Sequence, residues 1–216
     1  MIFLKRKMGK KIINILVLTI SLVGYSQTAK EYYERGLSKC KSQDYNGYHG
    51  AVEDFTKAIA INPNYGDAYY KRGLLKNIFQ DYPGIIQDLT KAIKINPKYG
   101  NVDTYSKIAN AKSMLEDYKG SIADYTKVLQ INPKDVDAYI GRAGAKQYLK
   151  DYKGATQDFT KIIEISPNYD DICNVYYHRG NCKIALKQKN EACLDFSKSA
   201  ELGCKHAHNV IKESCR

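Results

Sequence analysis

Residues 151–167 read DYKGATQDFTKIIEISP, and a closely similar phrase occurs three more times in the chain. The proline that closes each phrase follows Asn62, Asn96, Asn132 and Ser166, at intervals of 34, 36 and 34 residues. A period near 34 residues is typical of a repeat array. The sequence therefore predicts a chain built of successive similar units.

Each phrase predicts a helix that ends at its proline. Ala155, Phe159, Ile162 and Ile163 follow the spacing of three and four residues that places side chains on one helix face. The residue before a proline disfavours the helical region, so the helix ends there. One such amphipathic helix cannot bury its apolar face alone, whereas stacked neighbours can.

A second helix precedes each phrase, and the two are joined by a turn that reads Asp-Tyr with a nearby glycine. We expect these first helices to begin near Tyr32, Tyr69, Tyr105, Tyr139 and Tyr176. Four residues later comes a small residue in every unit: Gly36, Gly73, Ala109, Ala143 and Gly180. Because glycine destabilises a helix interior, its recurrence there predicts close packing between the two helices.

This arrangement resembles the tetratricopeptide repeat family. A shared signature of the second helix is a small or aliphatic residue followed four positions later by an aromatic residue or leucine: Ala51/Phe55, Ile85/Leu89, Ser121/Tyr125, Ala155/Phe159 and Ala192/Phe196. The resemblance implies an all-α, right-handed α-solenoid of about five repeats over residues 29–206. The expected bounds are 29–65, 66–101, 102–135, 136–169 and 170–206, with a capping helix at 207–216.

The chain departs from the family pattern in its charges. Lys stands in every repeat where the family has Tyr in the first helix, and Arg stands where the family has Leu except in the third repeat, which has Ile108 there. An Asp recurs in the second helix at positions 54, 88, 124, 158 and 195. Because like charges one turn apart repel each other, we expect each Asp to pair with the bases of its own repeat. The alternative is a solvated basic face that binds an anionic ligand.

The first 26 residues indicate a signal peptide. Five basic residues lie within residues 1–11, residues 12–24 are mostly apolar, and small residues follow. A retained membrane anchor and a short helix at the start of the folded domain are the alternatives. We expect an exported protein of the periplasm, the cell envelope or the extracellular space.

Composition excludes several other classes of protein. The 216 residues carry a net charge of +11, but five of the 34 basic residues lie in residues 1–26, so 29 bases face 23 acids in the rest, a net charge of +6. This small excess is weak support for nucleic-acid binding. No apolar run reaches 18 residues, which excludes several membrane spans and predicts none after cleavage of the signal peptide. No catalytic motif is present, and we expect neither an enzyme nor a cofactor or metal site.

Five of the six cysteines, Cys173, Cys182, Cys193, Cys204 and Cys215, lie in the last unit and its cap. In an exported chain this density predicts disulfides. Cys204 and Cys215 are too far apart to pair if they share one helix. Cys182–Cys193 and Cys173–Cys204 remain open, whereas similarity to the ends of exported bacterial repeat proteins favours Cys193–Cys215.

The family resemblance implies that the first helices line a concave groove that binds an extended peptide or a partner helix. The positions expected to face it are Tyr33, Leu37, Tyr70, Leu74, Ser106, Asn110, Ile140, Gly144, Tyr177 and Asn181. Some of these residues could instead pack one repeat against the next. The sequence therefore predicts a non-catalytic scaffold for a protein or peptide partner, and the alternative is a structural subunit incorporated permanently in a larger envelope complex.

Overall fold

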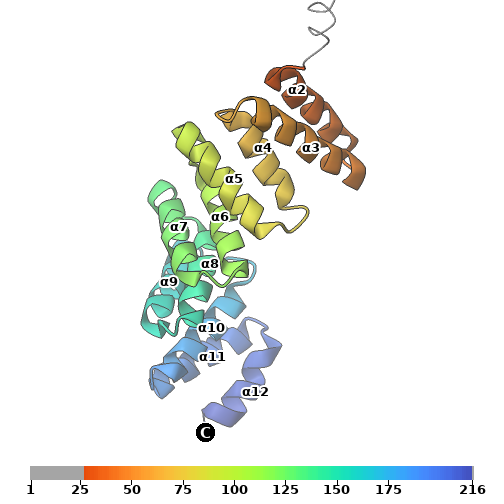
Figure 1. Cartoon of the computed structure of the whole chain (residues 1–216). Helices are drawn as coiled ribbons and strands as arrows, with labels where there is room; N and C mark the ends of the chain where they lie inside the picture. Colours follow the sequence, from red (N-terminus) through yellow and green to blue (C-terminus); the bar gives the residue numbers. More distant parts are fainter. Residues whose placement is uncertain (1–26, 216) are drawn as a thin grey trace, which may run out of the picture. The chain divides into compact units, whose positions relative to one another are not determined.

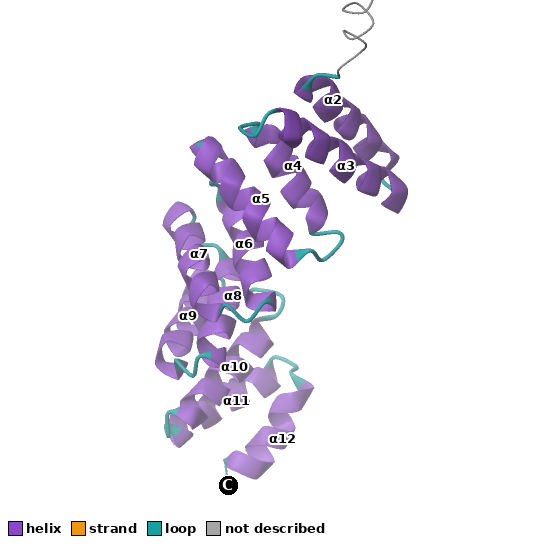
Figure 2. Cartoon of the chain, viewed as in Figure 1, coloured by secondary structure: helices purple, strands orange, loops and turns teal. Residues whose placement is uncertain are grey.

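A computed structural model describes residues 27–215, so the predicted signal peptide at 1–26 lies outside the described residues. The chain is built of helices joined by short turns, and residues 27–215 contain no strand (Figures 1 and 2). Among these residues, every helix is too short or too polar to cross a bilayer. The helices are α2 (Ala29–Lys39), α3 (Tyr45–Ile61), α4 (Gly66–Lys76), α5 (Tyr82–Ile95), α6 (Val102–Met114), α7 (Tyr118–Ile131), α8 (Val136–Tyr148), α9 (Tyr152–Ile165), α10 (Ile172–Ala185), α11 (Lys189–Glu201) and α12 (Lys205–Ser214), with 3-10 turns η1 (Cys40–Ser42) and η2 (Pro97–Tyr99).

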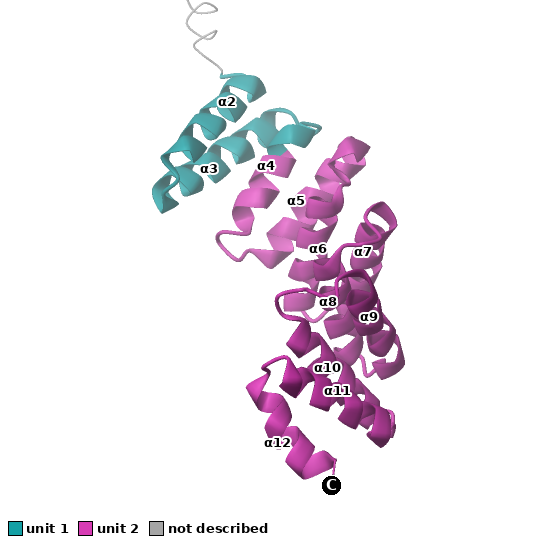
Figure 3. Cartoon of the chain, turned by 180° about the vertical axis from the view of Figure 1, so that it is seen from behind, with its two compact units in different colours: residues 1–68 teal, residues 69–216 magenta. Residues whose placement is uncertain are grey.

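The chain divides into two compact units between Ala68 and Tyr69 (Figure 3). In the first unit, α2 packs against α3. In the second unit, each helix from α5 to α12 packs against the next one along the chain. The predicted all-α organisation in successive helix pairs is confirmed.

The aspartate of each Asp-Tyr turn starts the second helix of its repeat. The side chain of Asp151 accepts a hydrogen bond from the backbone N–H of Gly154 at 2.9 Å, which satisfies a donor that the first helical turn leaves unpaired. Asp81 and Asp117 make the same contact with Gly84 and Gly120. A Cβ atom at any of these glycines would overlap the capping carboxylate, so a larger residue there would force the carboxylate to shift.

The recurrent glycine of the first helix permits the close packing that the sequence predicts. A Cβ atom added at Gly36 would lie 2.7 Å from the Phe55 ring, and one at Gly180 would lie 2.7 Å from the Phe196 ring. These separations are too short for a real carbon contact. In these two repeats the aromatic ring of the second helix therefore packs directly against the backbone of the first helix.

The first helices begin earlier than predicted, three residues before Tyr32, Tyr69, Tyr105 and Tyr139 and four before Tyr176. Capping residues upstream set these starts: the side chain of Asn101 accepts from Thr104 N–H at 3.0 Å, and that of Asp135 from Ala138 N–H at 2.9 Å. The tyrosines thus lie one turn inside the helix. Four second helices end where predicted, at Ile61, Ile95, Ile131 and Ile165.

The core of the second unit is divided among the junctions between repeats. One cluster joins α5 to α6, a second joins α6 and α7 to α8, and a third joins α8 and α9 to α10. These clusters contain Leu89, Tyr125 and Phe159, respectively. Each repeat therefore depends on its neighbours for burial, as expected of a repeat array.

The C-terminal helix α12 spans Lys205–Ser214 and packs on α11. It begins two residues before the predicted start of the capping helix, residue 207. A disulfide joins Cys193 of α11 to Cys215, the residue that ends α12. This is the pair that similarity to exported repeat proteins favours. The alternative bridge between Cys182 and Cys193 is not formed, because the Cys182 sulfur lies buried in the core cluster between α9 and α10, where it accepts a hydrogen bond from Gln147.

Candidate functional site

The aspartate of each second helix forms ion pairs with the first helix of its repeat. Asp158 is 3 % exposed, and it accepts hydrogen bonds from Arg142 Nε at 3.0 Å, from Arg142 Nη2 at 2.6 Å and from Lys146 Nζ at 2.8 Å. Equivalent pairs join Asp54, Asp88 and Asp195 to the Arg and Lys of their own repeats. The predicted contacts are confirmed, so these bases serve the fold and do not form a solvated face.

The third repeat has no arginine at this position, because Ile108 occupies it and packs into the core beside Leu89. Its aspartate, Asp124, is held instead by Lys112 and Lys127, each at 2.6 Å. The aspartate is therefore satisfied in every repeat, but in the third repeat by lysines alone.

We call the ion pairs between the aspartate and the bases of successive repeats the ladder. The arginine of this ladder also connects neighbouring repeats. Arg142 Nη1 donates to Thr126 Oγ1 of the preceding repeat at 3.1 Å, and Arg179 Nη1 donates to Thr160 Oγ1 at 3.1 Å. Each guanidinium also lies near the ring of the tyrosine one turn before it, with Arg142 5.5 Å from the centre of the Tyr139 ring. One side chain thus joins both helices of its own repeat to the second helix of the repeat before.

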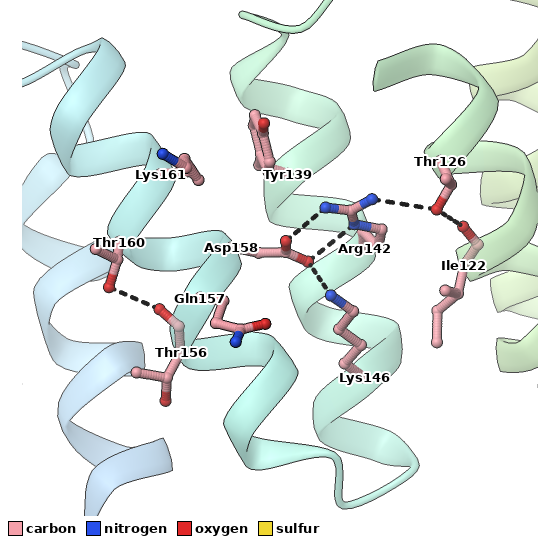
Figure 4. A pocket seen from close by; sticks show the side chains of 10 residues that line it. All are labelled: Ile122, Thr126, Tyr139, Arg142, Lys146, Thr156, Gln157, Asp158, Thr160 and Lys161. Atoms are coloured by element: carbon pink, nitrogen blue, oxygen red, sulfur yellow. Dashed lines mark hydrogen bonds and ion pairs between the residues drawn. The ribbon is translucent and has the colours of Figure 1, made fainter. Parts of the chain in front are cut away.

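A hollow of about 610 Å³ lies over this contact, between α7, α8 and α9 (Figure 4). Arg142 and Lys146 point from α8 toward Asp158 of α9, and Arg142 also reaches Thr126 of α7 (Figure 4). The remaining base, Lys161, pairs with Glu164 at 2.6 Å. The basic side chains that line this hollow are therefore all paired with acidic side chains of the same chain.

A second hollow, of about 250 Å³, opens between α6 and α8 over α7. We call it the α6–α8 hollow; it is lined by Asn110, Ser113, Met114, Tyr118, Tyr125, Gly141, Gly144, Ala145 and Tyr148. Two of these residues, Asn110 and Gly144, are positions that the family resemblance places on the groove. The structure thus brings two groove candidates from successive first helices into one cavity.

Aromatic and apolar side chains form the rim of the α6–α8 hollow. The Tyr118 and Tyr148 rings stack with centres 4.6 Å apart and planes within 3°. Tyr148 is 72 % exposed and Met114 is 61 % exposed, although large apolar surfaces are usually buried. Exposed aromatic and methionine side chains beside a cavity are typical of surfaces that bind other molecules.

A polar group lies at the same site. The Tyr125 hydroxyl donates to Asn110 Oδ1 at 2.5 Å, and burial, with a smaller contribution from the charge of Asp137, raises the pKa of Tyr125 to about 12. Asn110 itself is exposed, and within residues 27–215 its Nδ2 group makes no hydrogen bond. The fixed amide therefore keeps two donors for a ligand.

Two glycines of α8 shape the α6–α8 hollow in different ways. A Cβ atom at Gly141 would overlap the Tyr125 ring, so this glycine makes room for the ring. A Cβ atom at Gly144 would meet no other atom within 4 Å. Gly144 therefore leaves open space in the wall of the hollow and is not required by packing.

The other groove candidates mostly contact neighbouring side chains. Tyr70 stacks on Tyr99 with ring centres 4.7 Å apart, Leu74 packs beside Leu89, and Ile140 packs against the cluster around Phe159.

The Tyr33 and Tyr177 rings also lie against aromatic neighbours. The centre of the Tyr33 ring is 5.5 Å from that of Phe55, and burial raises the pKa of Tyr33 to about 12. The Tyr177 ring lies 5.9 Å from Phe196. Half-buried positions complete the set of candidates: Leu37, Ser106 and Asn181.

Sequence reasoning missed Met114, Tyr118, Tyr125 and Tyr148 as members of the α6–α8 hollow. Tyr118 belongs to the recurrent Asp-Tyr turn and Tyr125 to the second-helix signature, so both read as repeat structure. Tyr148 has a usable sequence signal, because it is an aromatic residue three positions before the Asp151-Tyr152 turn, at the predicted end of a first helix.

Comparison with known proteins agrees with this architecture. Residues 102–135 and 136–169 each match the family model described as tetratricopeptide repeat. Residues 102–169 are therefore two tetratricopeptide repeats. No curated protein sequence matches the chain.

Solved tetratricopeptide-repeat structures share the fold at low sequence identity. The crystal structure of YrrB, described as a protein with an unusual peptide-binding site, has a TM-score of 0.73 at 17 % identity and covers 90 % of this chain and 97 % of its own. A crystal structure of MamA has a TM-score of 0.69 at 20 % identity, covering 85 % and 96 %. MamA from Desulfovibrio magneticus RS-1, residues 41 to the end, has a TM-score of 0.64 at 17 % identity, covering 81 % and 94 %. These similarities show the solenoid fold.

Proposed function

We propose that this protein is a non-catalytic scaffold that binds a peptide segment or a partner helix in the α6–α8 hollow. The observation that supports this site is the combination of a stacked tyrosine pair at the rim, an asparagine amide with two unused donors and an open wall at Gly144. The tyrosines offer contact area with little conformational freedom to lose, which favours binding.

The chemistry of the hollow suits a peptide. Its volume accommodates one side chain rather than a whole small molecule, since ligand pockets usually exceed about 300 Å³. The Asn110 amide can donate to a backbone carbonyl of a segment that crosses the rim formed by Tyr148 and Met114. The peptide-binding site named for YrrB supports the same use of this fold.

The cellular location belongs to the proposal as well. The basic and then apolar character of residues 1–26 supports export to the cell envelope or beyond. The disulfide between Cys193 and Cys215 supports an oxidising compartment. A partner would then be an envelope or extracellular protein.

Binding can be tested with short peptides selected from a random display library against the wild-type chain. Gly144→Leu puts a side chain into the open wall, and we expect it to weaken the selected peptides at least about tenfold, the equivalent of 1.4 kcal/mol. Gly144→Ala and Lys161→Ala, the latter at the hollow of Figure 4, are the matched controls and should bind as the wild type does. Wild-type affinity in Gly144→Leu, with an unchanged circular dichroism spectrum, would refute the proposed site.

One observation favours permanent incorporation in a larger complex as the second candidate. Large apolar side chains stay exposed at the C-terminal ends of α4, α6, α8 and α10 or in the turns that follow them: Ile78, Met114, Leu115, Tyr148, Leu149 and Leu186. Obligate interfaces are rich in such residues. A chain that purifies only with a partner, and precipitates when separated from it, would favour this candidate over the peptide scaffold.

A further inference from the structure

Two thiols face each other at the C-terminal end of the second unit. Cys173 lies in the first turn of α10, and Cys204 is the residue that precedes α12. Their Sγ atoms are 2.7 Å apart, and Cys204 is 5 % exposed. Residues 31 positions apart in sequence are thus brought to a separation only slightly longer than a disulfide bond.

The surrounding backbone holds this pair in place. Ser199 Oγ donates to the carbonyl of Cys173 at 2.8 Å, and the backbone N–H of Cys204 donates to the carbonyl of Ser199 at 3.0 Å. Ser199, itself buried on α11, therefore positions both cysteines at once. The Cys204 thiol also lies 2.9 Å from Asn174 Oδ1.

The other cysteines of the described chain have different neighbours. Cys193 and Cys215 are bonded to each other, and the Cys182 sulfur accepts from Gln147 Nε2 at 3.1 Å. Cys40 belongs to the first compact unit. Within residues 27–215 no cluster of three or more His, Cys, Asp or Glu side chains is arranged to hold a metal ion, so the two thiols are not part of such a cluster.

We propose that Cys173 and Cys204 form a second disulfide when a disulfide donor is available. The donor R–S–S–R, either oxidised glutathione or an oxidised thiol–disulfide exchange protein, accepts two electrons and two protons. The two cysteine thiols lose those electrons and protons as their S–S bond forms, and two R–SH leave.

The order of the bonded residues gives the bridge its consequence. Cys173–Cys204 and Cys193–Cys215 interleave along the chain, so the start of α12 is tied to α10 and its end to α11. A terminal repeat has a neighbour on one side only and opens most easily. With both bridges closed, α12 cannot leave the array while α10 and α11 stay folded.

The test uses the purified full-length chain with and without oxidised glutathione at mildly alkaline pH, which increases the reactive thiolate fraction. Remaining thiols are alkylated after denaturation, and the peptides are identified by mass spectrometry. We expect a linked peptide containing Cys173 and Cys204 beside the Cys193–Cys215 peptide, with alkylation confined to Cys40 and Cys182. Full alkylation of Cys173 and Cys204 after oxidation, or their bonding to glutathione alone, would overturn the proposal.

Variants provide a second readout. Oxidation should raise the thermal midpoint of the wild type above that of the chain with only the Cys193–Cys215 bridge closed, and Cys173→Ser and Cys204→Ser should each abolish that increase. Cys182→Ser is the matched control and should retain the increase. An equal increase in Cys173→Ser would contradict a role for this pair, and the peptide analysis of the wild type decides the question if a variant fails to fold.

Discussion

Arg142 and Asp158 form a two-point contact, with Nε and Nη2 of the guanidinium each donating to one oxygen of the carboxylate. Lys146 donates to the same carboxylate, and Thr126 Oγ1 accepts a hydrogen bond from the third guanidinium nitrogen, Nη1. Two bases and one buried acid therefore hold α8 and α9 together and connect them to α7. Because the acid is the common partner, its removal affects every one of these elements.

We predict that Asp158→Ala lowers the free energy of unfolding by about 3 kcal/mol or more, since removing one member of a buried ion pair leaves the others uncompensated. Asp124→Ala should cost less, about 2 kcal/mol, because Asp124 is held by lysines alone and Lys127 is half exposed. Urea unfolding of both variants measures the difference. Glu164→Ala, which removes an exposed pair with Lys161, is the control and should change stability by less than about 0.5 kcal/mol. Unchanged stability in Asp158→Ala and Asp124→Ala would contradict a structural role for the ladder.

Asp54 makes the stability of the first unit sensitive to acid. Burial alone would raise the pKa of Asp54, but hydrogen bonds from Arg35 and Lys39 outweigh it and hold the pKa below its ordinary value. A carboxyl whose folded pKa is lowered stabilises the fold above its unfolded pKa of about 4, and this stability is lost as the pH falls through the folded value.

We therefore expect the thermal midpoints of the wild type and Asp54→Asn to differ at neutral pH and to converge as the pH falls below about 4. Differential scanning calorimetry across this range measures the gap. A gap that stays constant with pH would show that the variant acts through packing rather than through the charge of Asp54.

Tyr125 gives the second unit a matching sensitivity to base. Its folded pKa of about 12 lies above the unfolded value of about 10, so its contribution to stability is complete below pH 10 and is lost between about pH 10 and 12. Tyr125→Phe should remove this alkaline loss and cost about 1 kcal/mol at neutral pH, because the hydrogen bond to Asn110 disappears. Tyrosinate absorbance and thermal unfolding at the same pH values follow both effects. Ionisation of every tyrosine near pH 10 in the folded wild type would contradict the burial of the Tyr125 hydroxyl.

The parts of the molecule that the sequence predicts are those that repeat. Gly36 and Gly180 predict close helix contacts, and the aspartates at 88 and 158 predict ion pairs. These residue types recur at the same position of successive repeats, which indicates a contact inside the same repeat. The two-helix unit and its proline boundary follow from the same periodicity. The sequence predicts the starts of the first helices three or four residues too late, because their caps, such as Asn101 and Asp135, vary from repeat to repeat.

The candidate site is less predictable because it depends on how two successive repeats meet. Asn110 and Gly144 were found by their register on the first helices. Tyr118 and Tyr148 stack only because the turn of the third repeat lies beside the end of α8, a relation that no spacing within one repeat encodes. Tyr70 has the register of a groove residue but stacks on Tyr99, which lies in η2, the turn that connects α5 to α6.

The disulfide between Cys193 and Cys215 should account for much of the stability of the C-terminal end. It closes a loop with a sequence separation of 22, for which a stabilisation of about 3 kcal/mol is typical. We predict that Cys215→Ser, or reduction of the wild type with dithiothreitol, increases hydrogen exchange in α12 and the neighbouring turn of α11 while α6 to α8 exchange as before. The confinement follows from repeat architecture, in which each unit contacts only its neighbours. Cys193→Ser should reproduce Cys215→Ser, and the double variant should be no worse than either single one, because both changes remove the same bond. Additive losses, or protection of α12 that survives reduction, would show that the helix is held by its packing on α11 and not by the bridge.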